Sequence, residues 1–283
     1  MRIVSYIFNI KFFNTVYRYS NNTLIKKVGI MDIKLEFFNS LKEAIENTYV
    51  SQEKKIKKVA KMFYDTIEND GVIQLFGVKH GQEFVNELNF RAGGLAPYHG
   101  LSLKELIFKE IITQEEYDDG SVFNRPEILN DMLSLFKLDD RDLYVLVSQY
   151  GNEPLLIELA KYCKEKGHTL VAVINKKSYD VAQPLHESGK KLLDFADEYL
   201  DMSMEEPDIA LHVGKYNVGQ LSSTVSNVMA QMITAEVYNL YVSNGKEAPI
   251  LLSANVKGAD VHNNRLTDVY EGRVRQHGRC KII

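Results

Sequence analysis

Hydrophobic residues along most of the chain either recur at the spacing of helices or gather in the short runs that are typical of buried strands. Between residues 35 and 68 they recur at mostly helical spacing with Lys and Glu between them, which predicts one or two amphipathic helices. The Asp70-Gly71 pair is expected to end this region, and the apolar run at 72–76 predicts a buried strand. A helical pattern then returns and is expected to stop at the glycine pair 93–94.

The same succession of strand, loop and helix is found again further along the chain. The sequence predicts a strand at 143–148, a helix at 155–167 and another strand at 169–175. Two apolar strands joined by one helix form a unit whose strands pair in parallel, so a parallel sheet is expected. Later strands are expected at 198–202 and 249–254, with a long helix between them from about 223 to 242.

The first thirty residues differ from the rest in charge. They contain five Lys or Arg residues and no Asp or Glu; with a net charge of −4 for the whole chain, the remainder carries −9. We interpret residues 1–30 as a loosely ordered extension or an overlong start, and a basic arm that touches an anionic surface is the alternative. Residues 31–283 contain no linker or repeat and are expected to form one domain. Within it, residues 95–123 are the least patterned part, either an excursion over the sheet edge or a lid.

Composition excludes several classes of protein. A chain of 283 residues with 45% hydrophobic and 25% charged content is typical of globular proteins and unlike collagen or disordered chains. Cys163 and Cys280 form no metal-binding or disulfide pattern and are expected to be reduced thiols, and no metal or organic cofactor is expected. The small net charge disfavours nucleic acid as a partner. No apolar run reaches the roughly 18 residues of a membrane helix, so a cytoplasmic protein is expected.

Three glycine-containing loops are candidates for ligand binding, because ligands of open parallel sheets bind beyond the carboxyl ends of the strands. They lie at 76–81, 148–154 and 218–224. Each combines glycine with hydroxyl or amide side chains near the start of a helix, where backbone N–H groups favour an anion. Convergence of the three loops predicts a phosphate site. The alternative is that their Ser and Thr residues only cap helices, which contributes about 1 kcal/mol each.

Four stretches of the chain resemble the phosphosugar-binding domain of the sugar isomerase (SIS) family. They read VIQLFGVKHGQEFVNELNFRAGGLAP, LYVLVSQYGNEPLLIELAKYCKEKGHTLVAVIN, HESGKKLLDFADEYLD and SANVKGADVHNNRLTDVYEGRV. The resemblance covers about residues 31–278 and is closest to a bacterial group often labelled phosphoheptose isomerase. It implies an α/β fold: a three-layer, flavodoxin-like α/β/α sandwich with a five-stranded parallel sheet, preceded by N-terminal helices. It also implies a homodimer or tetramer with a site shared between subunits.

The resemblance further implies a set of phosphosugar-binding residues, some of which depart from the family pattern. The first loop lacks one glycine and has Gly81 in place of the family's serine, so Lys79 is expected to supply charge instead. The second loop has Tyr150 in place of its second serine, and this phenol either binds phosphate from further away or fills the pocket. The expected binding residues are Gly77, Lys79, His80, Ser148, Tyr150, Gly151, Asn152, Ser222, Ser223, Thr224 and Asn255.

Catalytic residues are also implied. Aldose–ketose interconversion needs a base that moves a proton between two carbons and a second group that opens the ring. Glu87 aligns with a glutamate that acts as the base in several SIS isomerases, and His262 is its expected partner. An ordinary helix carboxylate and a surface or capping histidine are the alternatives. His186 also matches a histidine-containing turn of the family. The helix expected at 223–242 lacks the histidine of phosphoheptose isomerases, which argues against that activity in particular.

The sequence thus favours a protein that binds a small sugar phosphate, with isomerisation by Glu87 and His262 as the expected reaction. A non-catalytic phosphosugar sensor is the main alternative, and it is favoured by the hydroxyl groups lost at Gly81 and Tyr150. A lyase on the same fold that uses a glutamate near the first loop is a third possibility, because fold alone does not determine the reaction.

Overall fold

A five-stranded parallel sheet organises the computed structural model, which describes residues 32–205, 208–270 and 272–274. Its strands follow one another in space as β2-β1-β3-β4-β5. They are β1 (Ile73–Gly77), β2 (Tyr98–Gly100), β3 (Leu143–Val147), β4 (Thr169–Ile174) and β5 (Glu198–Asp201). Because β2 and β3 flank β1 on opposite sides, the loops that follow β1 and β3 diverge. That divergence makes the carboxyl ends of these two strands the expected ligand crevice.

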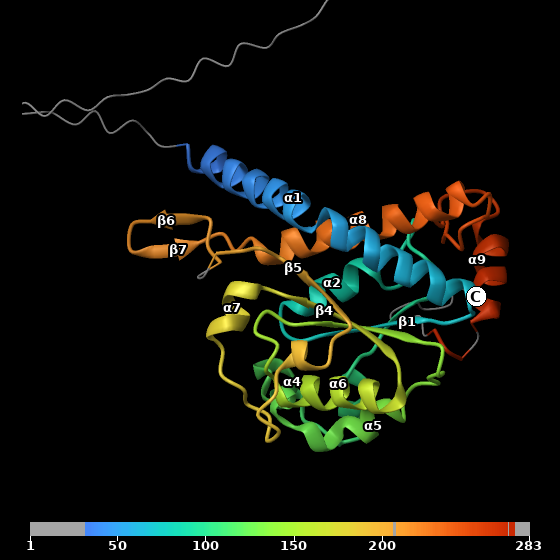
Figure 1. Cartoon of the computed structure of the whole chain (residues 1–283), viewed down its shortest axis with the longest axis horizontal. Helices are drawn as coiled ribbons and strands as arrows, with labels where there is room; N and C mark the ends of the chain where they lie inside the picture. The colour runs from blue at the N-terminus through green and yellow to red at the C-terminus, as the bar shows by residue number, and fades with distance from the viewer. Residues whose placement is uncertain (1–31, 206–207, 271, 275–283) are drawn as a thin grey trace, which may run out of the picture. The chain divides into compact units, whose positions relative to one another are not determined.

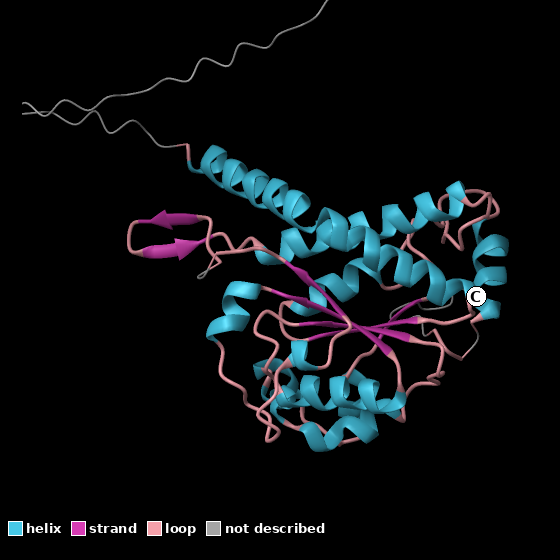
Figure 2. Cartoon of the chain, viewed as in Figure 1, coloured by secondary structure: helices cyan, strands magenta, loops and turns pink. Residues whose placement is uncertain are grey.

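Helices cover both faces of the sheet and form a three-layer α/β/α sandwich (Figures 1 and 2). One face packs against α1 (Ile33–Glu68), α2 (Gly81–Leu88) and α8 (Ser222–Ser243), and the other against α3 (Lys104–Phe108), α4 (Gln114–Asp119), α5 (Leu129–Leu133) and α6 (Pro154–Lys166). Successive strand residues alternate between the two cores: Leu143 and Val145 face the first, and Tyr144 and Leu146 face the second. Both faces of the sheet are buried, which explains the continuous apolar runs in the strands. The predicted α/β fold class is confirmed.

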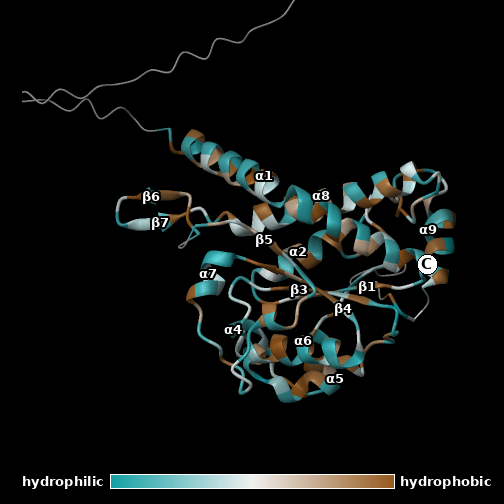
Figure 3. Cartoon of the chain, viewed as in Figure 1, coloured by the Kyte–Doolittle hydropathy of each residue, from teal (hydrophilic) through white to brown (hydrophobic). Residues whose placement is uncertain are grey.

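The helix α1 covers the free edge of β5. Its Thr48 hydroxyl donates to the carbonyl of Met202 at 2.9 Å, and the side-chain oxygen of Gln52 accepts from the backbone N–H of Asp201 at 3.0 Å. Both polar side chains are buried. They satisfy backbone groups that an edge strand would otherwise leave unpaired. Hydrophobic and hydrophilic residues interleave along α1 and α6, as expected of amphipathic helices (Figure 3).

The remaining elements lie at the periphery of the sandwich. A two-stranded antiparallel hairpin, β6–β7, precedes α8, and α9 lies at the opposite end of α8 from this hairpin (Figure 1). These and the other peripheral elements are α7 (Lys176–Val181), β6 (Leu211–Val213), β7 (Tyr216–Val218), α9 (Ala259–Val269), and the 3-10 segments η1 (Ser121–Asn124), η2 (Pro126–Ile128) and η3 (Leu192–Asp194).

Most predicted elements are present, and two predictions are wrong. The strand expected at 249–254 does not form; Ile250 makes a single antiparallel bridge to Leu95, and Leu251 packs into a small side cluster. The sheet reaches its five strands through β2, which was not predicted and lies within the weakly patterned segment 95–123. The helix expected to reach the glycine pair 93–94 ends at Leu88, because the next residue turns the backbone into an extended conformation.

The boundary predicted between residues 30 and 31 stays a prediction, since residues 1–31 lie outside the described part of the chain. None of the helices that the structure describes is long and apolar enough to cross a membrane.

Candidate functional site

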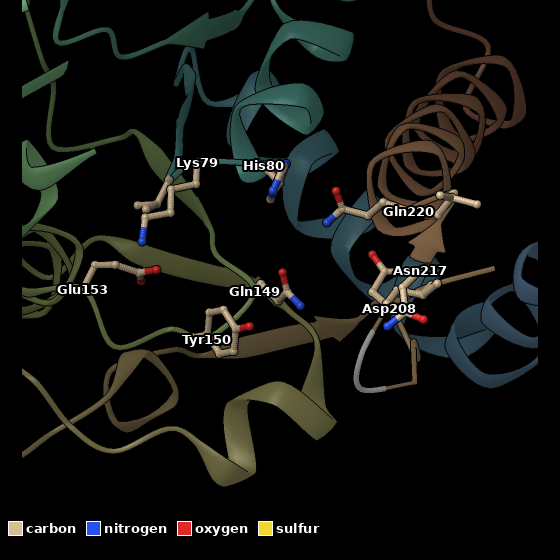
Figure 4. Close-up of a pocket in the computed structure, with 12 residues that line it drawn as sticks. Lys79, His80, Gln149, Tyr150, Glu153, Asp208, Asn217 and Gln220 are labelled. Atoms are coloured by element: carbon tan, nitrogen blue, oxygen red, sulfur yellow. The ribbon is translucent and has the colours of Figure 1, made fainter. Parts of the chain in front are cut away.

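A cavity of about 500 Å³ lies at the carboxyl ends of β1 and β3, where the fold predicts a ligand site. The three loops singled out in the sequence all contribute to it, and Figure 4 shows the side chains arranged around it. The cavity is lined by Val78, Lys79, His80, Gln149, Tyr150, Glu153, Asp208, Ile209, Asn217, Val218, Gly219 and Gln220. The predicted binding residues Lys79, His80 and Tyr150 are therefore brought together.

The loop between β1 and α2 is shaped by two close backbone approaches. A Cβ atom on Gly77 would lie 2.3 Å from the carbonyl oxygen of Gly81, and one on Gly81 would lie 2.4 Å from that of Val147. Neither position has room for a side chain, so the serine that the family carries at Gly81 does not fit this backbone. Lys79 has a positive φ of 50°, and both Lys79 and His80 extend exposed side chains beside the cavity.

Side chains of the loop between β3 and α6 accept hydrogen bonds from the loop's own backbone N–H groups. The buried hydroxyl of Ser148 accepts hydrogen bonds from the backbone N–H groups of Tyr150 at 3.2 Å and Gly151 at 2.8 Å. It donates to the Glu153 carboxylate at 2.8 Å, and this carboxylate also accepts from the N–H of Asn152 at 3.2 Å. The phenol of Tyr150 is 37% exposed and lines the cavity, so it neither fills nor closes it.

The N-terminus of α8 is also capped by an internal carboxylate. Asp208 is buried and accepts from the backbone N–H groups of Leu221 at 3.1 Å and Ser222 at 2.9 Å. The predicted ligands Ser222, Ser223 and Thr224 do not line the cavity; the preceding residues of the loop, up to Gln220, do so instead. The Ser222 hydroxyl is buried and has no hydrogen-bond partner among the described residues.

The charges and polar groups of the cavity are divided between its sides. Lys79 and Glu153 lie on one side, and Asp208, Asn217 and Gln220 lie across from them (Figure 4). Amide side chains both donate and accept hydrogen bonds, which suits the hydroxyl groups of a carbohydrate. The exposed lysine can contact an anionic group. This arrangement can hold a small polar ligand with at most one strongly anionic end.

The two predicted catalytic residues lie elsewhere in this chain. Glu87 on α2 is half-buried, accepts from the Gln231 amide on α8 at 2.8 Å and pairs with Arg91. His262 belongs to α9, where its Nε2 contacts the carbonyl oxygen of Ile250 at 2.9 Å. Neither of them lines the cavity.

Two further predicted residues have local structural contacts. Asn255 is exposed in the turn before α9, where its N–H donates to the Ser253 hydroxyl at 3.4 Å. The imidazole of His186 is buried and contacts the Glu158 carboxylate at 2.9 Å and the Ser188 hydroxyl at 2.8 Å, which fixes the loop between α7 and η3. Neither residue lines the cavity.

Sequence reasoning missed the carboxylates and amides of the site. Glu153 stands within a loop that was examined, directly before the proline that begins α6, where an acidic residue favours a helix start. Gln220 lies within the loop 218–224 that was singled out for its glycine and polar side chains, although it was not named as a binding residue. Asp208 and Asn217 lie in or beside the β6–β7 hairpin, whose strands of three residues each carry no recognisable pattern. No sequence signal could have placed Asp208 and Asn217.

The described residues contain no group of three or more His, Cys, Asp or Glu side chains that could hold a metal ion. Cys163 is a free thiol on the buried face of α6, and this burial raises its pKa above the ordinary value, which makes the thiol unreactive. Cys280 lies outside the described residues.

Comparisons with known proteins agree with the fold. The SIS domain family matches residues 36–175. A UPF0309 protein from Geobacillus sp. (strain WCH70) is 31% identical over 245 residues, which cover 84% of this chain and 96% of that protein. Another, from Halalkalibacterium halodurans, is 30% identical and covers 84% of this chain and 94% of its own.

A solved structure from Bacteroides fragilis, described as a phosphosugar isomerase involved in capsule formation, superposes with a TM-score of 0.51 at 16% identity. The match covers 76% of this chain and 92% of that one, and it supports the fold. The chain therefore belongs to the UPF0309 family, and its residues 36–175 match the SIS domain.

Proposed function

We propose that this protein binds a sugar phosphate in the cavity at the carboxyl ends of β1 and β3. The observation that carries the proposal is the convergence of the three loops on one cavity of about 500 Å³, which is large enough for such a ligand. Amide groups of Gln149, Asn217 and Gln220 line the cavity beside Lys79, and Lys79 can contact the phosphate. The Gln149 amide nitrogen already donates to Ser178 and the Asn217 oxygen already contacts His212, so their remaining amide atoms and those of Gln220 would contact sugar hydroxyls. The solved structure from Bacteroides fragilis resembles this chain in fold, and this likeness supports the same ligand class only by analogy.

Binding is supported better than catalysis. An isomerase needs a base within hydrogen-bonding reach of the substrate carbon, and neither Glu87 nor His262 lines the cavity of its own chain. Isomerisation by these residues would therefore require a second subunit to bring them to the cavity. A non-catalytic phosphosugar sensor is the second candidate function, and the distance of both residues from the cavity favours it.

A thermal-shift screen tests the binding function, because a ligand that binds only the folded state raises the unfolding temperature. Sugar phosphates would be compared with their unphosphorylated parents at equal concentrations. We expect at least one phosphorylated sugar to stabilise the protein more than its parent does. If every phosphorylated compound behaved like its parent, the phosphosugar proposal would be wrong.

Turnover of a stabilising sugar phosphate separates enzyme from sensor. If Glu87 is the base, Glu87→Gln abolishes product formation and leaves binding intact. Equal turnover by this variant would exclude Glu87 as the base, and saturable binding with no product from the unsubstituted protein would identify a sensor.

We also propose that the protein forms a homodimer or tetramer, with the cytoplasm as its expected location. The first turns of α1 carry exposed apolar side chains, with Ile33 at 41%, Leu35 at 56% and Phe38 at 60% exposure. This end of α1 adjoins the cavity wall, since Gly219 packs against the ring of Phe37. Dilution to the monomer should therefore weaken ligand binding, and full affinity in the monomer would refute a shared site.

A further inference from the structure

The loop between β3 and α6 has the shape of an anion-binding cradle. The backbone N–H groups of Tyr150, Gly151 and Asn152 and the hydroxyl of Ser148 all make hydrogen bonds within a segment of six residues. This segment leads directly into the first turn of α6, where the helix dipole adds to the attraction for negative charge. An anion lies at this place in the structure, and it is the carboxylate of Glu153.

The hydrogen-bond donors of this cradle already bond to side chains of the protein itself. A serine hydroxyl has one proton to donate, and the proton of Ser148 goes to the Glu153 carboxylate at 2.8 Å. The N–H of Asn152 donates to the same carboxylate oxygen at 3.2 Å. A phosphate could receive these hydrogen bonds only if the Glu153 side chain left its position. Glu153 is 5% exposed and lines the cavity, so its charge lies where such a phosphate would bind.

A second carboxylate repeats this arrangement across the cavity. Asp208 accepts hydrogen bonds from the N–H groups of Leu221 and Ser222 at the start of α8, a second helix terminus beside the cavity. Lys79 is the single lysine or arginine among the lining residues, whereas two carboxylates, those of Glu153 and Asp208, line the same cavity. Charge repulsion therefore opposes a dianionic phosphate at either helix terminus.

We propose that Glu153 is a specificity-determining residue, a built-in anion that competes with phosphate for the loop between β3 and α6. The inference rests on the proposed function for its choice of ligand class. It adds that phosphate reaches this loop only by displacing the carboxylate. The affinity for phosphorylated ligands is accordingly held down by the charge of Glu153 rather than by a lack of donors.

The substitution Glu153→Gln tests this directly, because the amide keeps an oxygen that can accept from Ser148 and Asn152 but removes the charge. Inorganic phosphate and glucose 6-phosphate would be titrated calorimetrically into the unsubstituted protein and the variant. We expect both to bind the variant about tenfold more tightly or better, the change expected when one charge is removed close to a dianion. Unphosphorylated glucose should show no comparable gain.

Two further variants locate the effect. Glu165→Gln makes the same change of charge at an exposed position on the same helix outside the cavity, and it should leave phosphate affinity unchanged. Adding Ser148→Ala to Glu153→Gln removes a donor of the cradle and should abolish the gain. Circular dichroism and unfolding temperature confirm that each variant is folded.

The outcomes separate this proposal from the proposed function. If Glu153→Gln binds phosphate no more tightly than the unsubstituted protein, or if Glu165→Gln shows the same gain, the role of Glu153 is refuted, whatever the screen of sugar phosphates shows. If the variant gains phosphate binding while the unsubstituted protein is stabilised by no sugar phosphate, the role of Glu153 stands. In that case the proposed function is wrong, because the natural residue closes the site to phosphate.

Discussion

At the scale of single residues, contacts that cannot be read from the sequence determine whether the loops can bind phosphate. The replacement of the family's serine by Gly81 reads in the sequence as a lost phosphate ligand. In the structure it is a packing requirement, because the backbone of Gly81 lies against the end of β3. Ser148 was predicted to bind the phosphosugar, whereas its partner Glu153 was not considered, because the hydrogen bond between them depends on the turn formed at Gly151.

Restoring the serine at Gly81 is therefore expected to destabilise the protein. A Cβ atom there would lie 2.4 Å from the Val147 carbonyl oxygen, which is backbone of the central strand and cannot move aside cheaply. We expect Gly81→Ser to lower the free energy of unfolding by about 2 kcal/mol, as overpacking typically does. Urea denaturation measures this loss. A variant as stable as the unsubstituted protein would show that the two backbones are not in close contact.

At the scale of secondary-structure elements, the strands β1, β3, β4 and β5 were predictable from the sequence, whereas the edge strand β2 was not. The strands β1, β3 and β4 are buried on both faces, so each appears in the sequence as a continuous apolar run. The strand β2 has three residues and follows a glycine- and proline-containing segment, which leaves no pattern to detect. The apolar run at 249–254 was mistaken for a strand, because burial in a side cluster gives the same signal as burial in a sheet.

The helix α8 depends on a cap that comes from outside its own sequence. Asp208, fourteen residues before Ser222, accepts from the N–H groups of Leu221 and Ser222. Asp208→Ala should lower the free energy of unfolding by about 1–2 kcal/mol, the usual cost of losing such a cap, and Asp208→Asn should lose less because it keeps one acceptor. Chemical denaturation of both variants provides the comparison. Equal stability of Asp208→Ala and the unsubstituted protein would contradict the capping role.

At the scale of the whole molecule, the C-terminal segment is attached to the amino-terminal side of the sheet. The guanidinium of Arg273 pairs with the Asp142 carboxylate, which is fully buried, and donates to the carbonyl of Asp70 at 2.7 Å. Asp142 also accepts from the N–H of Val72 and the amide of Gln74, both at 2.9 Å. These contacts join residues that lie between 68 and 203 positions apart in the sequence, which no local pattern could reveal.

Removal of this arginine should be costly. Arg273→Ala leaves the Asp142 charge buried without its cationic partner, and we expect a loss of about 3 kcal/mol in the free energy of unfolding. Arg141→Ala is the matched control, because Arg141 pairs with Asp139 at the surface and should contribute less than about 1 kcal/mol. Equal losses for the two variants in urea denaturation would show that burial does not strengthen the Arg273 contact.

The central claim is that the cavity at the carboxyl ends of β1 and β3 is the ligand site, and calorimetric titration of three proteins tests it most directly. The ligand is the sugar phosphate that gives the largest thermal shift, and the proteins are the unsubstituted chain, His80→Ala and Asn255→Ala. His80 lines the cavity, whereas Asn255 was expected from the sequence to bind but lies in the turn before α9. We predict that His80→Ala weakens binding about tenfold and that Asn255→Ala leaves it unchanged. Loss of affinity in Asn255→Ala with full affinity in His80→Ala would contradict the account.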